Sequence, residues 1–166
     1  HNIIYAPFAA SMVYGSLAAA VDSYRNNCVA AGKEPGRAMC SYFIHIADTP
    51  EEDDFGRQAM MDYFKYCVLR AFPDDPETMP PTMHYFMQIN EILRNMEKDK
   101  LSKNSVLIGN AAAITEQLKE VEEAGIDECI LYFNVGKKPH SLVKDQMYKF
   151  MEEVAPNFEA YQVAAE

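Results

Sequence analysis

The first third of the chain alternates between continuous apolar runs and a pattern with helical period. Residues Asn2–Phe8 form a short β-branched and aromatic run that contains Pro7, and a second apolar run covers Met39–Ala47. Runs without polar alternation are typical of strands buried on both faces of a parallel sheet. Between them, apolar side chains recur at helical spacing, which predicts an amphipathic helix over Ser16–Ala31 with Gly32 as its cap.

A strong helix start follows the second apolar run. Thr49 suits the N-cap, Pro50 suits the first turn, and Glu52 completes a T-x-x-E capping box. The helical period then continues through Phe55, Ala59, Tyr63, Cys67 and Arg70. A proline-rich loop, Pro73–Pro81, separates this helix from another one that we expect over Thr82–Lys98.

The last third of the chain repeats the alternation. Val106–Ile108 is a brief apolar run, and Asn110 caps a helix whose apolar side consists of Ile114, Leu118 and Val121. Glu128–Phe133 is the third predicted strand. The final helix lies between Pro139 and Pro156, and its expected buried face consists of Val143, Met147, Phe150 and Val154. Three strands, each followed by a helix, predict parallel pairing through right-handed crossovers.

The expected fold class is α/β, and the expected architecture is part of a TIM (β/α)8 barrel. Such a barrel takes about 250 residues or more, whereas this chain has 166. The predicted strands would then be roughly strands 6–8 with their helices. Residues 1–166 would be the C-terminal portion of one barrel domain, and we expect the N-terminal half of the barrel to precede this sequence. Because part of a barrel leaves strand edges open, we also expect a homo-oligomer.

Composition narrows the range of partners. The formal net charge is −10, which argues against a nucleic-acid groove or an anionic membrane surface, because both need clustered Lys and Arg. The sequence contains no run of about 18 apolar residues that could span a bilayer. We therefore expect a protein that binds neither nucleic acid nor membrane.

Neither the cysteines nor the histidines show the spacing of a metal site. The chain has four of each, with no C-x-x-C and no H-x-x-H pair. A secreted disulfide scaffold would be smaller and richer in cysteine. We therefore expect no metal, and free thiols packed in the core of a cytoplasmic protein, since the cytoplasm is a reducing compartment. These thiols belong to Cys28, Cys40, Cys67 and Cys129.

An ordered set of short motifs spans almost the whole chain. In order, the motifs are Gly36-Arg37, Asp48-Thr49, Gly109 with Ile114 and Leu118, Ala124-Gly125-Ile126-Asp127-Glu128, Phe133-Asn134-Val135-Gly136, Pro139-His140 and Val154-Ala155-Pro156. In this order they resemble the motifs of the bacterial-luciferase-like flavin-dependent monooxygenases. The resemblance looks closest to the subgroup found in natural-product biosynthesis.

The resemblance implies an oxidoreductase that uses reduced FMN, or in some branches the deazaflavin F420. It implies dioxygen as the oxidant, a small organic or carrier-bound substrate, and a separate flavin reductase as a partner. In this family the catalytic and phosphate-binding residues lie mostly on earlier strands of the barrel. No catalytic residue is therefore carried over to this sequence, and the chain by itself is expected to be inactive.

Barrel geometry supplies the remaining candidates, because the chemistry of such folds lies at the C-terminal ends of the strands. There, Phe8 and Phe133 would wall a flavin ring, and Asn134 would hydrogen-bond its edge or a substrate carbonyl, with Gly136 in the same turn. His45 lies inside a strand and is a weak candidate for an acid or base. Each candidate has a structural alternative, namely aromatic packing for the phenylalanines and a hydrogen-bonded core position for the histidine.

A second function class stays open. If the chain is a complete unit, the open edge of its parallel sheet must be covered by another chain or another copy. That arrangement would describe a non-catalytic α/β module that oligomerises through its sheet edge.

Overall fold

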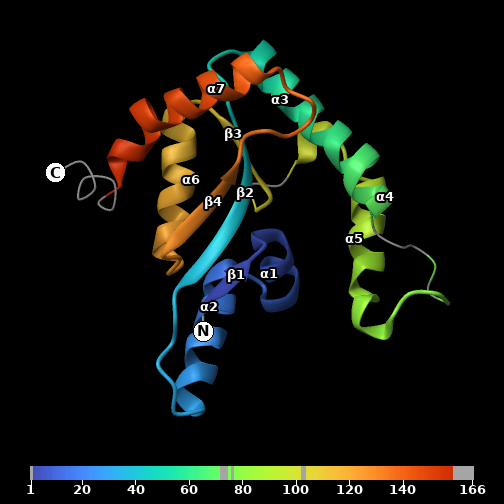
Figure 1. Ribbon diagram of the computed structural model, residues 1–166, viewed down its shortest axis with the longest axis vertical. Coiled ribbons are helices and arrows are strands. Elements are labelled where there is room, and N and C mark those ends of the chain that lie inside the picture. The colour runs from blue at the N-terminus through green and yellow to red at the C-terminus, as the bar shows by residue number, and fades with distance from the viewer. Residues whose placement is uncertain (1, 72–74, 76, 102–103, 159–166) are drawn as a thin grey trace.

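The computed structural model describes residues 2–71, 75, 77–101 and 104–158 of the chain. Within them, helices pack around an open sheet of four parallel strands (Figure 1). The strands are β1 (Ile3–Tyr5), β2 (Ala38–Ile46), β3 (Val106–Gly109) and β4 (Glu128–Tyr132). The predicted α/β class with parallel pairing is therefore confirmed.

The central strand β2 pairs with two strands along one edge and with one strand along the other. Met39 pairs with both β1 and β4, so these two strands lie on opposite edges of β2. Phe43 pairs with both β3 and β4, so β3 shares the edge of β1, further along β2. The three strands predicted from the sequence thus lie side by side in chain order. The brief run at Val106–Ile108 is an additional strand that the sequence analysis did not count.

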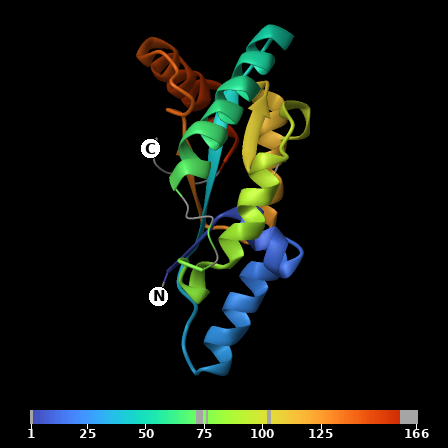
Figure 2. The ribbon, with the colours of Figure 1, turned by 90° about the vertical axis from the view of Figure 1, so that its right-hand side faces the viewer.

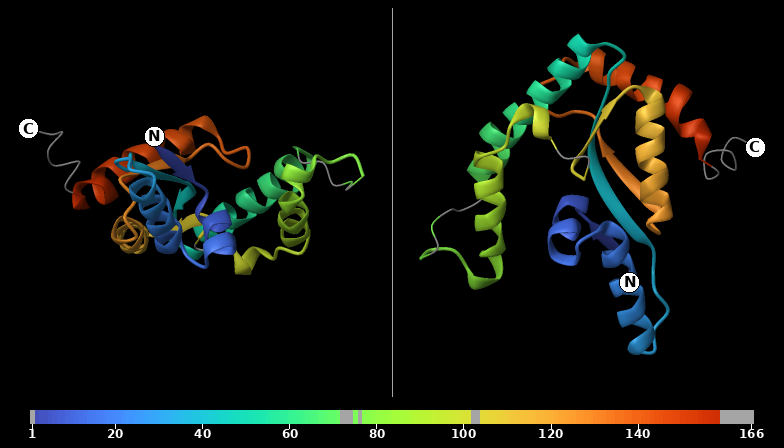
Figure 3. Two further views of the ribbon diagram at one scale, coloured as in Figure 1. Left: turned by 90° about the horizontal axis from the view of Figure 1, so that it is seen from below. Right: turned by 180° about the vertical axis from the view of Figure 1, so that it is seen from behind.

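Helices follow each strand. They are α1 (Pro7–Tyr14), α2 (Leu17–Ala30), α3 (Pro50–Tyr63), α4 (Leu69–Ala71), α5 (Tyr85–Arg94), α6 (Ala111–Glu123) and α7 (His140–Lys149). A π-helical turn, Phe64–Val68, joins α3 to α4, and another, Phe150–Val154, lengthens α7. Shorter 3₁₀ turns occur at Pro81–Met83, Lys98–Lys100 and Ala155–Asn157. The helices α3, α4 and α5 form an arm that reaches away from the sheet (Figures 1 and 3), and this arm faces the viewer in Figure 2.

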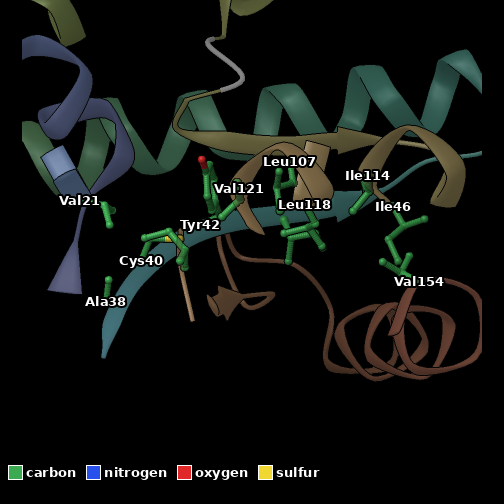
Figure 4. Packing of buried hydrophobic residues seen from close by; sticks show 12 residues of the cluster. Val21, Ala38, Cys40, Tyr42, Ile46, Leu107, Ile114, Leu118, Val121 and Val154 are labelled. Atoms are coloured by element: carbon green, nitrogen blue, oxygen red, sulfur yellow. The ribbon is translucent and has the colours of Figure 1, made fainter. Parts of the chain in front are cut away.

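Side chains of β2 point alternately to two hydrophobic cores. The first core combines Cys40, Tyr42, Ile44 and Ile46 of β2 with Ile114, Leu118 and Val121 of α6 (Figure 4). Phe43 points to the other face and packs against the second core, which consists of Met60, Met61, Phe64, Leu93, Leu101, Val106 and Val135. The buried face predicted for α6 is therefore confirmed.

The capping residues predicted from the sequence do what was expected of them. The Thr49 hydroxyl accepts a hydrogen bond from the Glu52 amide at 3.2 Å, and the Asn110 side chain accepts one from the Ala113 amide at 2.9 Å. Each bond satisfies an amide that has no partner within its own helix. These helix starts are therefore determined locally.

The chain after β1 differs from the prediction. The first strand was expected to extend to Phe8, but it ends at Tyr5, and Pro7 begins α1. Proline suits this position because its fixed φ matches a helix and its missing N–H would have no partner there. The pattern of α1 is weakly amphipathic, which is why the sequence analysis missed it.

Two helices bury their predicted faces only in part: Ala59 and Val154 are buried as expected, but other predicted positions are not. In α3, Phe55 is 45% exposed while Gly56 is buried, and Cys67 in the following π-helical turn is exposed. In α7, Met147 is 52% exposed while Gln146 is buried. Both differences come from contacts with β2, where Gly56 meets a histidine ring and Gln146 binds the backbone.

The helix after the proline-rich loop is shorter than predicted. The helix predicted over Thr82–Lys98 is α5, Tyr85–Arg94, preceded by a 3₁₀ turn. The predicted loop Pro73–Pro81 lies partly outside the described residues. None of the helices among the described residues has the length and apolar character needed to cross a membrane.

Candidate functional site

His45 lies near the C-terminal end of β2 and is 1% exposed. Its Nε2 is 3.1 Å from the Glu52 carbonyl oxygen, and its ring centroid is 5.9 Å from that of Phe55. The next residue of α3 is Gly56, where a Cβ atom would lie 2.1 Å from the imidazole Cδ2. Glycine at this position therefore lets α3 pack directly on the histidine ring.

The tautomer of His45 follows from its partner. A carbonyl oxygen can only accept, so Nε2 carries the proton and Nδ1 is the bare acceptor. Nδ1 is buried and has no hydrogen-bond partner among the described residues. Burial, and next the positive charge of Lys138, lower the pKa of His45 to about 4. His45 is therefore neutral at pH 7.

The lowered pKa of His45 makes stability depend on pH. Between its ordinary pKa of about 6.5 and the folded value of about 4, the unfolded chain binds a proton that the folded chain does not. Stability contributed by the neutral ring is therefore full above pH 6.5 and is lost as pH falls toward 4. On going from pH 7 to pH 5, we expect wild type to lose about 2 kcal/mol more unfolding free energy than His45→Gln. Urea unfolding at both pH values measures the difference.

The exposed His140, at the start of α7, offers a matched control for this experiment. His140→Gln should lose as much stability as wild type between the two pH values. Equal losses in wild type and His45→Gln would contradict the assignment of the pH dependence to His45.

Lys138 is the second buried titratable group at this end of the sheet. It is 6% exposed, and its Nζ donates to the carbonyl oxygens of Ile44, at 3.1 Å, and Phe133, at 3.2 Å. Both acceptors are neutral, and burial lowers the pKa of Lys138 to about 8. The ammonium group thus ties the end of β2 to the end of β4, where the strand ladder stops.

Gln146 continues the same edge of β2. Its side-chain amide donates to the Ile46 carbonyl oxygen at 2.7 Å and accepts from the Ile46 amide at 2.6 Å. The paired bonds replace those that a neighbouring strand would make, because β4 has already ended. Side chains of Lys138 and Gln146 therefore complete the backbone pairing of β2 beyond β4.

An apolar cavity of about 280 Å3 lies on the opposite face of β2 from α6, between α1, α5 and the π-helical turn after α3. Aromatic rings line it, namely those of Phe8, Phe43, Phe64 and Phe86. The centroids of Phe43 and Phe64 are 5.4 Å apart in an edge-to-face arrangement. Ser41 and Asn104 add polar groups to the lining. Such a cavity can take a planar or apolar group.

The structure does not bring the predicted cofactor residues together. Phe8 lines the aromatic cavity, whereas Phe133 packs against the first core, with its ring centroid 5.8 Å from that of Phe150. Asn134 is exposed in the turn after β4. Gly136 packs against α3, because a Cβ there would lie 2.1 Å from the Ala59 carbonyl oxygen. A single flavin ring therefore cannot contact both Phe8 and Phe133.

Lys138 and most of the residues that line the cavity were not predicted from the sequence. Lysine is usually a surface residue, and the doublet Lys137-Lys138 after the third strand reads as an ordinary polar turn. The one available signal was its position at a strand end, where barrel folds place chemistry. Phe64 and Phe86 come from helices of the arm, and their approach to β2 has no signature in local sequence.

Metal ligands and known relatives add no further candidates. In the part of the chain that the structure describes, no group of three or more His, Cys, Asp or Glu side chains could hold a metal ion. No family model matches the chain, and no curated protein matches it.

Proposed function

We propose that the chain is the C-terminal portion of a luciferase-like, flavin-dependent monooxygenase, and that its aromatic cavity holds the ring system of reduced FMN. When bound, the reduced flavin would supply two electrons to dioxygen, so that one oxygen atom enters a small organic substrate and the other leaves as water. The residues of this chain would bind and orient the ring and exclude water from it. The observation that carries the proposal is the aromatic cavity beside the end of β1.

The strand arrangement supports the barrel part of the proposal. Three parallel strands, β1, β2 and β4, lie side by side in chain order, as consecutive strands of a (β/α)8 barrel do. Sites in such barrels lie at the C-terminal ends of strands, and Ala6, Pro7 and Phe8, directly after β1, all line the cavity. In contrast, β3 shares the edge of β1 and adds a strand that a regular barrel of three units would not place there.

The chemistry of the cavity supports the flavin part. Its volume of about 280 Å3 is near the lower end of the range for ligand sites, which suits a single ring system better than a whole nucleotide. Aromatic pairs contribute about 0.5–1.5 kcal/mol beyond the burial of apolar area. Phe8 and Phe43 would make such contacts with the flavin ring, and the hydroxyl of Ser41 would give the ring a polar contact.

Anaerobic equilibrium dialysis with reduced FMN tests the proposal. We expect the chain to retain reduced FMN and Phe43→Ala to weaken its binding about tenfold, which corresponds to about 1.4 kcal/mol. The change removes one aromatic wall of the cavity. Phe133→Ala is the matched control, because it removes the same side chain from the other face of the sheet.

Far-ultraviolet circular dichroism of both variants separates lost binding from lost folding. The proposal is wrong if the folded wild-type chain retains no reduced FMN. The placement of the ring is wrong if both variants lose affinity equally while their folding is intact.

A further inference from the structure

Two cysteines that are distant in sequence face each other across the sheet. Cys40 of β2 and Cys129 of β4 are register partners, and their Sγ atoms lie 3.8 Å apart. Both are free thiols. Cys40 is fully buried in the first core (Figure 4), whereas Cys129 is partly exposed. The sequence spacing of 89 residues hides this pair from any motif search.

The backbone geometry suits a disulfide between them. Neighbouring strands lie about 4.7–4.9 Å apart, and disulfides join Cα atoms that are about 4.4–6.8 Å apart. Register partners on adjacent strands direct their Cβ atoms to the same face of the sheet. Rotation of the two side chains can therefore bring the sulfur atoms together while the strands stay paired.

We propose that Cys40 and Cys129 form a redox-responsive pair, which hydrogen peroxide or an equivalent two-electron oxidant converts into a disulfide between β2 and β4. Cys129 is the more accessible thiol and reacts first: its sulfur bonds to one peroxide oxygen, the O–O bond breaks, and water leaves. The Cys40 sulfur then attacks the Cys129 sulfur, the S–O bond breaks, and a second water leaves. Two thiols and one peroxide thus become one disulfide and two waters.

Burial makes this reaction slow in the folded protein. The pKa of the Cys129 thiol is raised, first by its hydrogen bond with Cys40 and then by burial. Because the thiolate is the reactive form, the pair stays reduced during brief exposure to oxidant. The turn that precedes β4 is held by Arg25, whose guanidinium donates to the Gly125 carbonyl oxygen at 2.7 Å.

The disulfide would change the stability of the sheet edge. Among the described strands, β4 pairs only with β2, and edge elements open more easily than central ones. A covalent bond between Cys40 and Cys129 ties β4 to the central strand and also restricts the unfolded chain. Oxidised protein should therefore unfold at a higher urea concentration than reduced protein.

The double variant Cys28→Ser/Cys67→Ser provides a clean test, because the full chain then keeps only this pair of its four cysteines. One sample is incubated with hydrogen peroxide, and another is refolded from urea in an oxidising glutathione buffer, which removes the kinetic barrier of burial. We expect both samples to lose two titratable thiols and the mass of two hydrogen atoms, to remain without intermolecular crosslinks, and to unfold at a higher urea concentration.

The triple variant with Cys129→Ser in addition is the matched control, and it should form no intramolecular bond and show no increase in urea midpoint. The proposal is overturned if the refolded double variant keeps both thiols. It is also overturned if peroxide adds oxygen to the protein without removing the two hydrogen atoms. Neither result depends on flavin binding, so this test and that of the proposed function fail independently.

Discussion

Replacing Gln146 with leucine is expected to lower the free energy of unfolding by about 2–6 kcal/mol. Leucine fills a similar volume but cannot pair with the amide and carbonyl of Ile46, which the glutamine binds at 2.6 and 2.7 Å. Each buried backbone group left unpaired costs about 1–3 kcal/mol. Urea unfolding at pH 7 measures the loss, because the linear dependence on urea gives the free energy in water.

Two further variants show whether the backbone bonds cause this effect. Met147→Leu changes the exposed neighbour and should stay within about 0.5 kcal/mol of wild type. Gln146→Glu keeps an acceptor for the Ile46 amide but places a carboxylate against the Ile46 carbonyl, so we expect it also to be destabilised. A midpoint of Gln146→Leu equal to that of wild type would show that Gln146 does not substitute for a strand.

Gly136→Ala is the second substitution with a large expected effect, about 2–5 kcal/mol of destabilisation. Gly136 has φ +74, where an L-residue costs about 1–2 kcal/mol. In addition, the new Cβ would lie 2.1 Å from the Ala59 carbonyl oxygen, and relieving such a contact costs about 1–3 kcal/mol. The opposing atom belongs to the backbone of α3 and cannot rotate away. Thermal and urea unfolding should both report the loss.

Gly32→Ala separates the two contributions. Gly32 has φ +66, yet nothing lies within 4 Å of the position where its Cβ would be. This variant should therefore show the cost of positive φ alone, and its loss should be clearly smaller than that of Gly136→Ala. Equal losses would mean that the close approach of α3 to the turn after β4 contributes nothing.

The two substitutions test the same end of the sheet. Gly136 lets the turn after β4 approach α3, and this turn carries Lys138, whose ammonium binds the Ile44 and Phe133 carbonyls. Gln146 then covers the last residue of β2 from α7. Gly136 was expected to contact a flavin, but in the structure it lies against Ala59 of α3 and belongs to the packing that positions Lys138.

The local sequence pattern predicted the structure correctly where residues within the same segment determine it. The side chains of Thr49 and Asn110 cap the helices that follow them. The spacing of Ile114 and Leu118 predicted the face of α6 that is buried, because a single amphipathic helix on a sheet has one apolar side to hide. The apolar run of β2 likewise predicted a strand, although only one of its faces is fully buried along its length and the other is partly buried.

Periodicity was insufficient where a tertiary contact replaced an apolar side chain. A polar residue, Gln146, takes the buried position that the period of α7 assigned to Met147, because its amide completes the backbone pairing of β2. Gly56 is buried in place of Phe55 because α3 needs space for the ring of His45. Neither partner is close in sequence, so a helical period alone could not predict these contacts.

What the sequence by itself determined is the alternation of parallel strands and helices, their capped starts, and the position of His45 inside a buried strand. What only the tertiary structure decided is which of the side chains meet. Phe8 and Phe133 lie on different faces of the sheet, Lys138 is buried between two strand ends, and Cys40 lies against Cys129. Local propensity depends on neighbours along the chain. These side-chain contacts depend instead on the register of strands that lie 89 or more residues apart in the sequence.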